Sequence, residues 1–330
     1  MNHNYRVDWQ AGMQLSDQVF RAADDYYLSC LRPLYATLVN GDYGFCDLPI
    51  FRYELSDSDI SVTELRANAI TASGKLIRLD YVKGQRMLFQ HITFPDTTNP
   101  VILFIDTTSD KTVKVDEPGV TVPLCDVDYQ MIVKLETEHY NNPDAVPLAR
   151  FVFRHGWSLD PSFIAPCITL RSNGALLRAA SNYVVELEAL SQALQAVVQT
   201  DQHDWVMSVL PLLARTSIEI QKEVDSMTPR HLITLMQEVI QVLSVLSHVV
   251  EGVVIPEPQQ CVAFIESHYT PYVLGEMIEE GIRLTHLLIG MTKSFSVRTV
   301  STPMPDPLPV PNRPVRRPMD TSSMRKKLGR

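Results

Sequence analysis

The chain has 330 residues, of which 45% are hydrophobic and 20% charged, a composition typical of an ordinary folded protein with room for two domains. Its formal net charge of -9 argues against a protein whose main surface meets nucleic acid or anionic lipid, because neutralising phosphates requires clustered Lys and Arg. No apolar run approaches the ~20 residues of a membrane span, and the first residues lack the apolar region of a signal peptide. We therefore expect a cytoplasmic protein.

The first half of the chain has the pattern of a β domain preceded by one helix. The helix is predicted from Asp17 to about Leu38, with Ser16 as its N-cap and Pro33 disturbing its last part. From Asp59 to about Ile168, short β-branched and aromatic runs alternate with turn residues, as in an antiparallel sandwich or barrel. Examples of the predicted strands are Lys75–Tyr81, Arg86–Ile92, Val101–Ile105, Lys111–Val115, Tyr129–Glu136 and Val146–Phe153.

At Asn173-Gly174 the apolar period changes from that of strands to that of helices. Alternating four- and three-residue spacing links Leu176, Ala180, Tyr183, Leu187, Leu190, Leu194 and Val197. A second such series begins at Thr228-Pro229 and contains Leu232, Met236, Val239, Leu243, Leu246 and Val250. A helix between them is predicted to be interrupted at Pro211 or to start near it, and a last helix to run from Thr270-Pro271 to about Lys293. We expect an antiparallel helical bundle.

The heptad spacing of the first bundle helix has two interpretations. Positions of this kind form the core of an intramolecular bundle or the seam of an oligomer equally well. Spacing alone leaves both open.

After Phe295 the repeated prolines predict an extended or disordered tail. The basic side chains at its end are Arg313, Arg316, Arg317, Arg325, Lys326, Lys327 and Arg330. Such a tail serves as a solubilising terminus, as a polyproline ligand or as a contact with an anionic surface.

No motif in the sequence indicates catalysis, a cofactor or a metal. The chain has no phosphate-binding glycine loop, no H-x-x-x-H, no zinc-ligand cysteine spacing and no G-x-S-x-G. His155, in a turn after a predicted strand, is the most site-like histidine, although polar turn residues are ordinary there. The carboxylates Asp57, Asp59, Glu279 and Glu280 fit solvated faces or helix caps. The scattered cysteines predict buried free thiols in a reducing compartment: Cys30, Cys46, Cys125, Cys167 and Cys261.

One N-terminal motif is more specific than generic packing. Its residues are Val7, Trp9, Gly12, Met13, Leu15, Gln18 and Phe20. They resemble the V-x-W-x-x-G-M-x-L-x-x-Q-x-F signature that opens the TssK family, the baseplate subunit of the type VI secretion system. Further segments resemble the family in the same order, namely Tyr43–Phe45, Leu55, Leu65, Ile70–Gly74, Leu79–Asp80, Pro147–Arg150, Leu159–Asp160 and Phe163–Pro166.

The resemblance covers roughly residues 5–295 and implies an α+β, multi-domain protein. It implies an antiparallel β-sandwich shoulder over residues 1–172, a helical neck over 173–296, and here a Pro-rich basic tail over 297–330 where the family continues into a globular head. It also implies a homotrimer, a TssF/TssG wedge docked on the shoulder, and contact with TssL/TssM-like parts of the membrane complex. We accordingly expect a structural adaptor peripheral to the inner membrane, not an enzyme.

Three questions stay open at this stage. Trp9, Met13, Leu15 and Phe20 either pack onto the sandwich, the commoner fate of large apolar groups, or anchor a partner, with Met13 and Leu15 the better anchors. The heptad residues either line a trimer seam or fill a bundle core. The alternative functions are a phage-type tail or receptor-binding component and, more remotely, a β-sandwich enzyme or carbohydrate-binding module.

Overall fold

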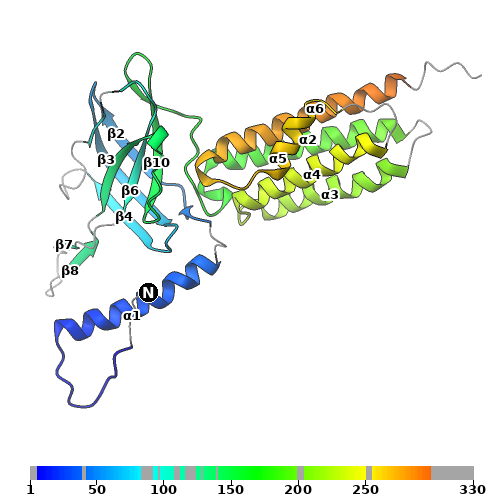
Figure 1. Cartoon of the computed structure of the whole chain (residues 1–330). Coiled ribbons are helices and arrows are strands. Elements are labelled where there is room, and N and C mark those ends of the chain that lie inside the picture. The colour runs from blue at the N-terminus through cyan, green and yellow to red at the C-terminus, as the bar shows by residue number, and fades with distance from the viewer. Residues whose placement is uncertain are drawn as a thin grey trace, which may run out of the picture.

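A computed structural model describes residues 6–38, 42–82, 92–95, 97–107, 112–115, 124–127, 129–138, 140–198, 204–249 and 255–298. The chain is an α+β molecule in which a two-sheet sandwich and a long helical bundle lie end to end (Figure 1). A separate N-terminal helix, α1 (Asp17–Leu38), lies along one side of the sandwich. The α+β class and the antiparallel sheets expected from the sequence are confirmed.

The first sheet is built around one long strand. This strand, β3 (Asp59–Ile70), pairs antiparallel with each of the others. They are β1 (Gly44–Phe45), β2 (Ile50–Leu55), β4 (Leu76–Val82) and β5 (Ile92–Thr93). Along β3 buried side chains alternate with half-buried or exposed ones over most of its length, which is the pattern of a strand covered on one face. A register shift at Arg52/Tyr53 in β2 marks a bulge.

The second sheet has the order β11-β10-β6-β9 and faces the first. Its strands are β6 (Val101–Asp106), β9 (Gln130–Leu135), β10 (Ala145–Phe153) and β11 (Trp157–Leu159). Phe151 joins the sheets, because its ring lies 5.6 Å from that of Tyr53 and 5.4 Å from that of Phe94. A hairpin of β7 (Thr112–Val115) and β8 (Leu124–Val127) stands apart, and the short helix η1 (Glu136–Glu138) follows β9.

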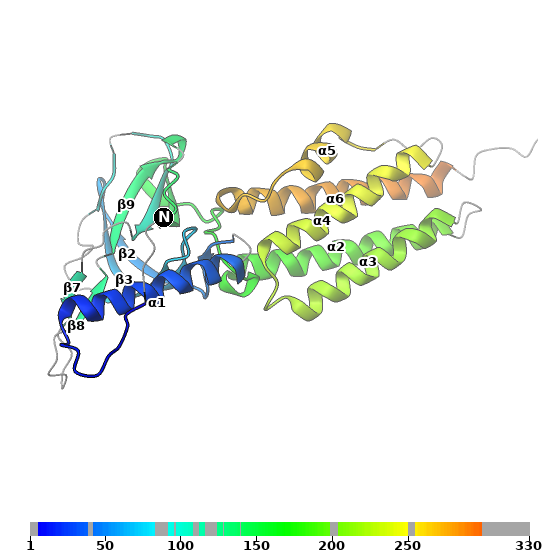
Figure 2. The ribbon, with the colours of Figure 1, turned by 60° about the horizontal axis from the view of Figure 1, so that its bottom comes forward.

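Four long helices and one short helix form the bundle. They are α2 (Gly174–Val198), α3 (Asp204–Glu223), α4 (Pro229–Val249), α5 (Pro258–Glu266) and α6 (Leu274–Arg298). Single 3-10 turns, η2 (Leu170–Ser172) and η3 (Pro271–Val273), precede α2 and α6. The long helices run side by side away from the sandwich, α2 packing on α3 and α6, and α4 on α3, α5 and α6 (Figure 2).

Most predicted elements have their expected places, with some corrections. The predicted strand Arg86–Ile92 lies outside the described residues except for Ile92. Pro211 does not interrupt the helix before it, since α3 continues through it. The short helix α5 was not predicted, and the strands before Asp59 were expected only from the family resemblance of Tyr43–Phe45 and Leu55. Among the thiols, Cys167 and Cys261 are buried, but Cys30 and Cys46 are exposed, and Cys125 is in a strand whose side chains are not described.

Candidate protein-interaction surface

The N-terminal motif forms a folded arm on α1. Met13 donates its backbone N–H to the Gln10 carbonyl at 3.1 Å, which closes a turn. Gly12, the third residue of that turn, has φ +83°, a value that glycine adopts without the strain other residues incur. The turn brings the arm back along the helix, so that the Trp9 ring lies 6.3 Å from the Phe20 ring. The glycine of the motif therefore has a backbone role.

The large apolar side chains of the motif stay exposed. Trp9 keeps 47% and Leu15 60% of its surface, and Met13 and Phe20 are exposed as well. The arm folds back on α1 through the contact of Trp9 with Phe20. Apolar side chains gathered on one exposed surface are typical of a contact site for another protein. The geometry of the chain alone therefore favours the anchoring alternative over packing onto the sandwich.

The heptad residues of the bundle lie in its interior. Leu176, Tyr183, Leu187, Leu190 and Leu194 of α2 have no exposed surface, and neither do Leu232, Met236 and Leu243 of α4. The side chains of Val197 and Leu246 are outside the described set. These positions form the core of a single chain, so a second chain has no access to them in this structure. Self-association, if it involves the bundle, needs another face.

Such a face lies on the outside of α3, where sequence analysis did not identify it. Met207, Pro211, Ala214 and Ile218 are exposed along it with four-, three- and four-residue spacing. The same spacing is present in the sequence, but the predicted break at Pro211 divided the helix that carries it.

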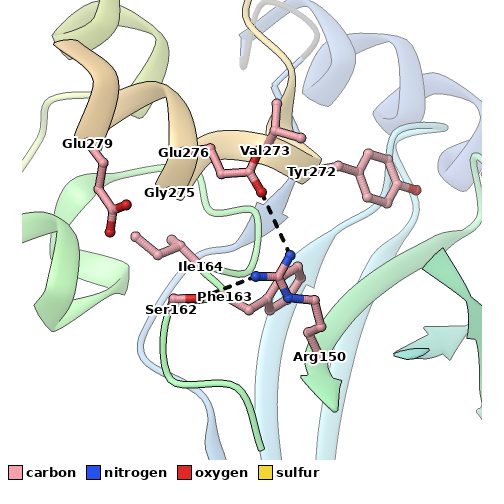
Figure 3. A pocket seen from close by; sticks show the side chains of 9 residues that line it. All are labelled: Arg150, Ser162, Phe163, Ile164, Tyr272, Val273, Gly275, Glu276 and Glu279. Atoms are coloured by element: carbon pink, nitrogen blue, oxygen red, sulfur yellow. Dashed lines mark hydrogen bonds and ion pairs between the residues drawn. The ribbon is translucent and has the colours of Figure 1, made fainter. Parts of the chain in front are cut away.

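A shallow groove at the junction of sandwich and bundle collects the second group of motif residues (Figure 3). Arg150 of β10 donates from Nε to Asp160 at 2.8 Å and from Nη2 to Ser162 at 3.2 Å. It also donates from Nη1 to Glu136 at 3.0 Å and approaches Glu276 of α6 at 3.8 Å. The Arg150 guanidinium is thus shared between both parts of the molecule.

The electrostatics of the groove are those of a structural ion-pair cluster. Burial by itself would raise the pKa of the Asp160 carboxyl, but hydrogen bonds from Ser162 and Arg150 outweigh burial and lower this pKa. The Arg150 guanidinium is occupied by its acidic and hydroxyl partners, which favours a role in joining the elements. The motif residues Pro147–Arg150 and Phe163–Pro166 therefore meet at the junction.

A second ion pair crosses the same junction. Asp42, only 3% exposed, accepts a hydrogen bond at 2.7 Å from Nε of Arg230 at the start of α4, and Nη2 of Arg230 lies 2.7 Å from the same carboxylate oxygen in an ion pair. Arg230 also lies over the ring of Tyr269 at 4.9 Å. Burial raises the pKa of the Asp42 carboxyl, while the hydrogen bond from Arg230 acts in the opposite direction. The Tyr272 hydroxyl donates to the Tyr140 carbonyl at 3.1 Å and adds a third link.

The remaining candidates from the sequence do not converge on a site. His155 is exposed in the turn between β10 and β11. Within the described residues, no group of three or more His, Cys, Asp or Glu side chains is arranged to hold a metal ion. None of the helices that the structure describes is long and apolar enough to cross a membrane. The basic tail, from Arg313 to Lys327, lies outside the described residues.

Comparisons by sequence give no relative, since no family model and no curated protein match the chain. Comparisons by structure match a crystal structure of TssK with a TM-score of 0.61 and 18% identity, over 87% of this chain and 69% of that one. A chain of the type VI secretion TssK-TssF-TssG baseplate subcomplex matches at 0.58 and 16%, over 87% of this chain and 99% of that one. TssK from EAEC in complex with a nanobody matches at 0.54 and 14%, over 82% and 99%. At these identities the likeness establishes the fold, which is that of TssK.

Proposed function

We propose that this protein is a structural subunit of a type VI secretion baseplate that works, like TssK, as an adaptor and not as an enzyme. The observation that carries the proposal is the fold match, which extends over 87% of the chain and so includes sandwich and bundle together. The solved structures it matches are baseplate proteins and complexes. A sandwich followed by a bundle in the same order is stronger support for a shared function than either domain alone, because β-sandwiches and helical bundles each serve many functions.

The proposed partners of the sandwich are TssF/TssG-like wedge proteins. One matched structure is a complex of TssK with TssF and TssG. In this chain the exposed motif residues Trp9, Met13, Leu15 and Phe20 offer the large apolar anchors that commonly dominate such contacts. We therefore assign wedge binding to the N-terminal arm.

The proposed assembly is a homotrimer. Because the heptad residues of α2 and α4 fill the core of one chain, we assign the contacts between copies to the outer stripe of α3, including Met207 and Ile218. Native mass spectrometry of the full chain tests this assembly directly. A stable monomer at micromolar concentration would refute the trimer.

Co-purification with wedge proteins from the native host tests the function itself. Replacing Met13 and Leu15 with Asp is expected to remove TssF/TssG-like proteins from the eluate while the chain stays folded by circular dichroism. The matched control is Val262→Asp, on the exposed side of α5, which should retain them. Wedge proteins retained equally by both variants would exclude the arm, and their absence even with the unmodified chain would contradict the baseplate assignment.

The basic tail is proposed to contact cytoplasmic parts of a TssL/TssM-like membrane complex, which would place the protein at the cytoplasmic side of the inner membrane. The support is its charge, carried by Arg313, Arg316, Arg317, Arg325, Lys326 and Lys327. Truncation after Val300 should weaken co-purification of membrane-complex proteins without loss of the wedge. Unchanged co-purification and secretion would rule this role out.

A further inference from the structure

The outward face of α1 carries a second heptad stripe that the bundle does not use. Phe20, Asp24, Tyr27, Leu31 and Leu34 follow one another with strict four- and three-residue spacing. All are exposed, Tyr27 by 55% and Leu34 by 51%, and the exposed Leu28 lies beside them. Such spacing is the pattern of a helix that packs against another helix along a narrow seam.

Apart from Phe20, whose ring lies 6.3 Å from the Trp9 ring, this stripe packs on no described helix or strand. The N-terminal arm meets the stripe at its first residue, Phe20, and leaves Tyr27, Leu31 and Leu34 exposed. The helix approaches the sandwich at the Arg32 carbonyl, which lies beside Gly74, and no described helix or strand packs along its length. A helix of 22 residues with so little buried surface is only marginally stable in water. A helical partner would stabilise it and cover the stripe.

The charges of α1 decide which arrangement of two such helices is favourable. Its N-terminal half carries Asp17, Asp24, Asp25 and Arg21, a net negative charge, and its C-terminal half carries Arg32. A parallel pair would place Asp24 of both copies in the same layer of the seam, where like charges repel. An antiparallel pair separates these carboxylates and aligns the acidic half of each helix with the half of the other that carries Arg32.

We propose that α1 binds the α1 of a second copy of this chain, antiparallel, about a two-fold axis near Leu28. With the axis there, Asp24 of one copy is level with Arg32 of the other, and the same pair recurs on the other side of the axis. The contact is self-complementary, as a two-fold interface must be. It does not depend on the proposed trimer: a monomer that pairs through α1 becomes a dimer, and a trimer whose three α1 helices pair with those of one other trimer becomes a hexamer.

The first test measures the mass of the full chain in solution. Replacing Leu31 and Leu34 together with Asp should halve the mass, whereas Val262→Asp on α5 should leave it unchanged. Because the leucine variant can also unfold α1, a charge exchange provides the second measurement. Asp24→Arg and Arg32→Asp should each lower the paired fraction at least several-fold, and the two substitutions combined should restore it.

Cysteine crosslinking tests the orientation. In a chain with the exposed Cys30 and Cys46 changed to Ser, the double variant Asp24→Cys/Arg32→Cys should form a covalent dimer on oxidation. Asp24→Cys alone should not. Crosslinking by Asp24→Cys alone would establish a parallel pair and overturn the proposal. A mass that is equal for the unmodified chain and the leucine variant would overturn it too, and would indicate that a different protein covers the stripe. If the leucine variant has half the mass of the unmodified chain, but neither mass corresponds to a multiple of three chains, the result would support α1 pairing and refute the trimer.

Discussion

Truncating Leu187 tests whether the heptad residues of α2 form the core of one chain or a seam between chains, because the two arrangements predict different effects on stability and on oligomeric mass. Its side chain has no exposed surface, so Leu187→Ala removes a fully buried group and leaves a cavity. Substitutions of this kind cost about 3 kcal/mol of unfolding free energy, within a usual range of roughly 2–5 kcal/mol. That corresponds to about a hundredfold change in the folded-to-unfolded ratio. Chemical denaturation followed by circular dichroism at helix wavelengths measures it.

The control lies two residues away on the same helix. Val185 is 62% exposed, and Val185→Ala should change stability by no more than about 0.5 kcal/mol. Both variants should keep the oligomeric mass of the unmodified chain. If Leu187→Ala instead lowered the mass at low protein concentration while unfolding at the same denaturant concentration as the control, the residue would line a seam and the intramolecular core would be wrong.

Three further changes follow from individual contacts. Gly74→Ala should loosen α1 from the sandwich, because Gly74 has φ +81° and a Cβ there would lie 2.7 Å from the Arg32 carbonyl. Trypsin should then cleave after Arg21 or Arg32 faster than in the unmodified chain. Arg230→Ala leaves the Asp42 carboxylate buried without its partner and should cost about 3–5 kcal/mol in denaturation, whereas Asp42→Asn combined with it should recover part of this loss. Because the pKa of the Asp160 carboxyl is lower in the folded protein than in the unfolded chain, its ionised form stabilises the fold at neutral pH, and this stabilisation is lost as the pH falls through the folded pKa. Asp160→Asn should therefore reduce the loss of stability between neutral and acid pH. An unchanged pH dependence would contradict the role of Asp160 in the ion-pair cluster.

Periodicity was sufficient to predict the elements whose residues are covered on one side along their whole length. The heptads of α2 and α4 belong to this class, whereas β6 and β10 are buried at nearly every position and were predicted from their runs of apolar residues. It was insufficient for α5, whose nine residues give little more than two turns of pattern. It also wrongly predicted an interruption at Pro211. The proline removes one backbone hydrogen bond of α3, but the burial of its neighbours Val209 and Leu213 keeps the helix continuous.

The junction between sandwich and bundle was beyond prediction from spacing. The Asp42 and Arg230 side chains are separated by 188 positions, and Arg150 of β10 reaches Glu276 of α6 across a comparable distance in sequence. Neither pair leaves a local pattern, since each residue alone fits an ordinary surface position. The resemblance to TssK pointed to the segment around Arg150 but gave no physical reason for it. The reason is the ion-pair cluster that joins the two parts.

A heptad establishes that a helix needs a partner, and the number of helices in the chain determines whether the partner comes from the same molecule. The stripes of α2 and α4 are satisfied internally, because α3 and α6 pack beside them and leave their seam residues buried. The stripe of α1 has the same spacing but no described neighbour of its own, so its leucines remain in water. Hydrogen exchange in α1 should therefore slow as protein concentration rises, while exchange in α2 should not, because only α1 depends on a second molecule.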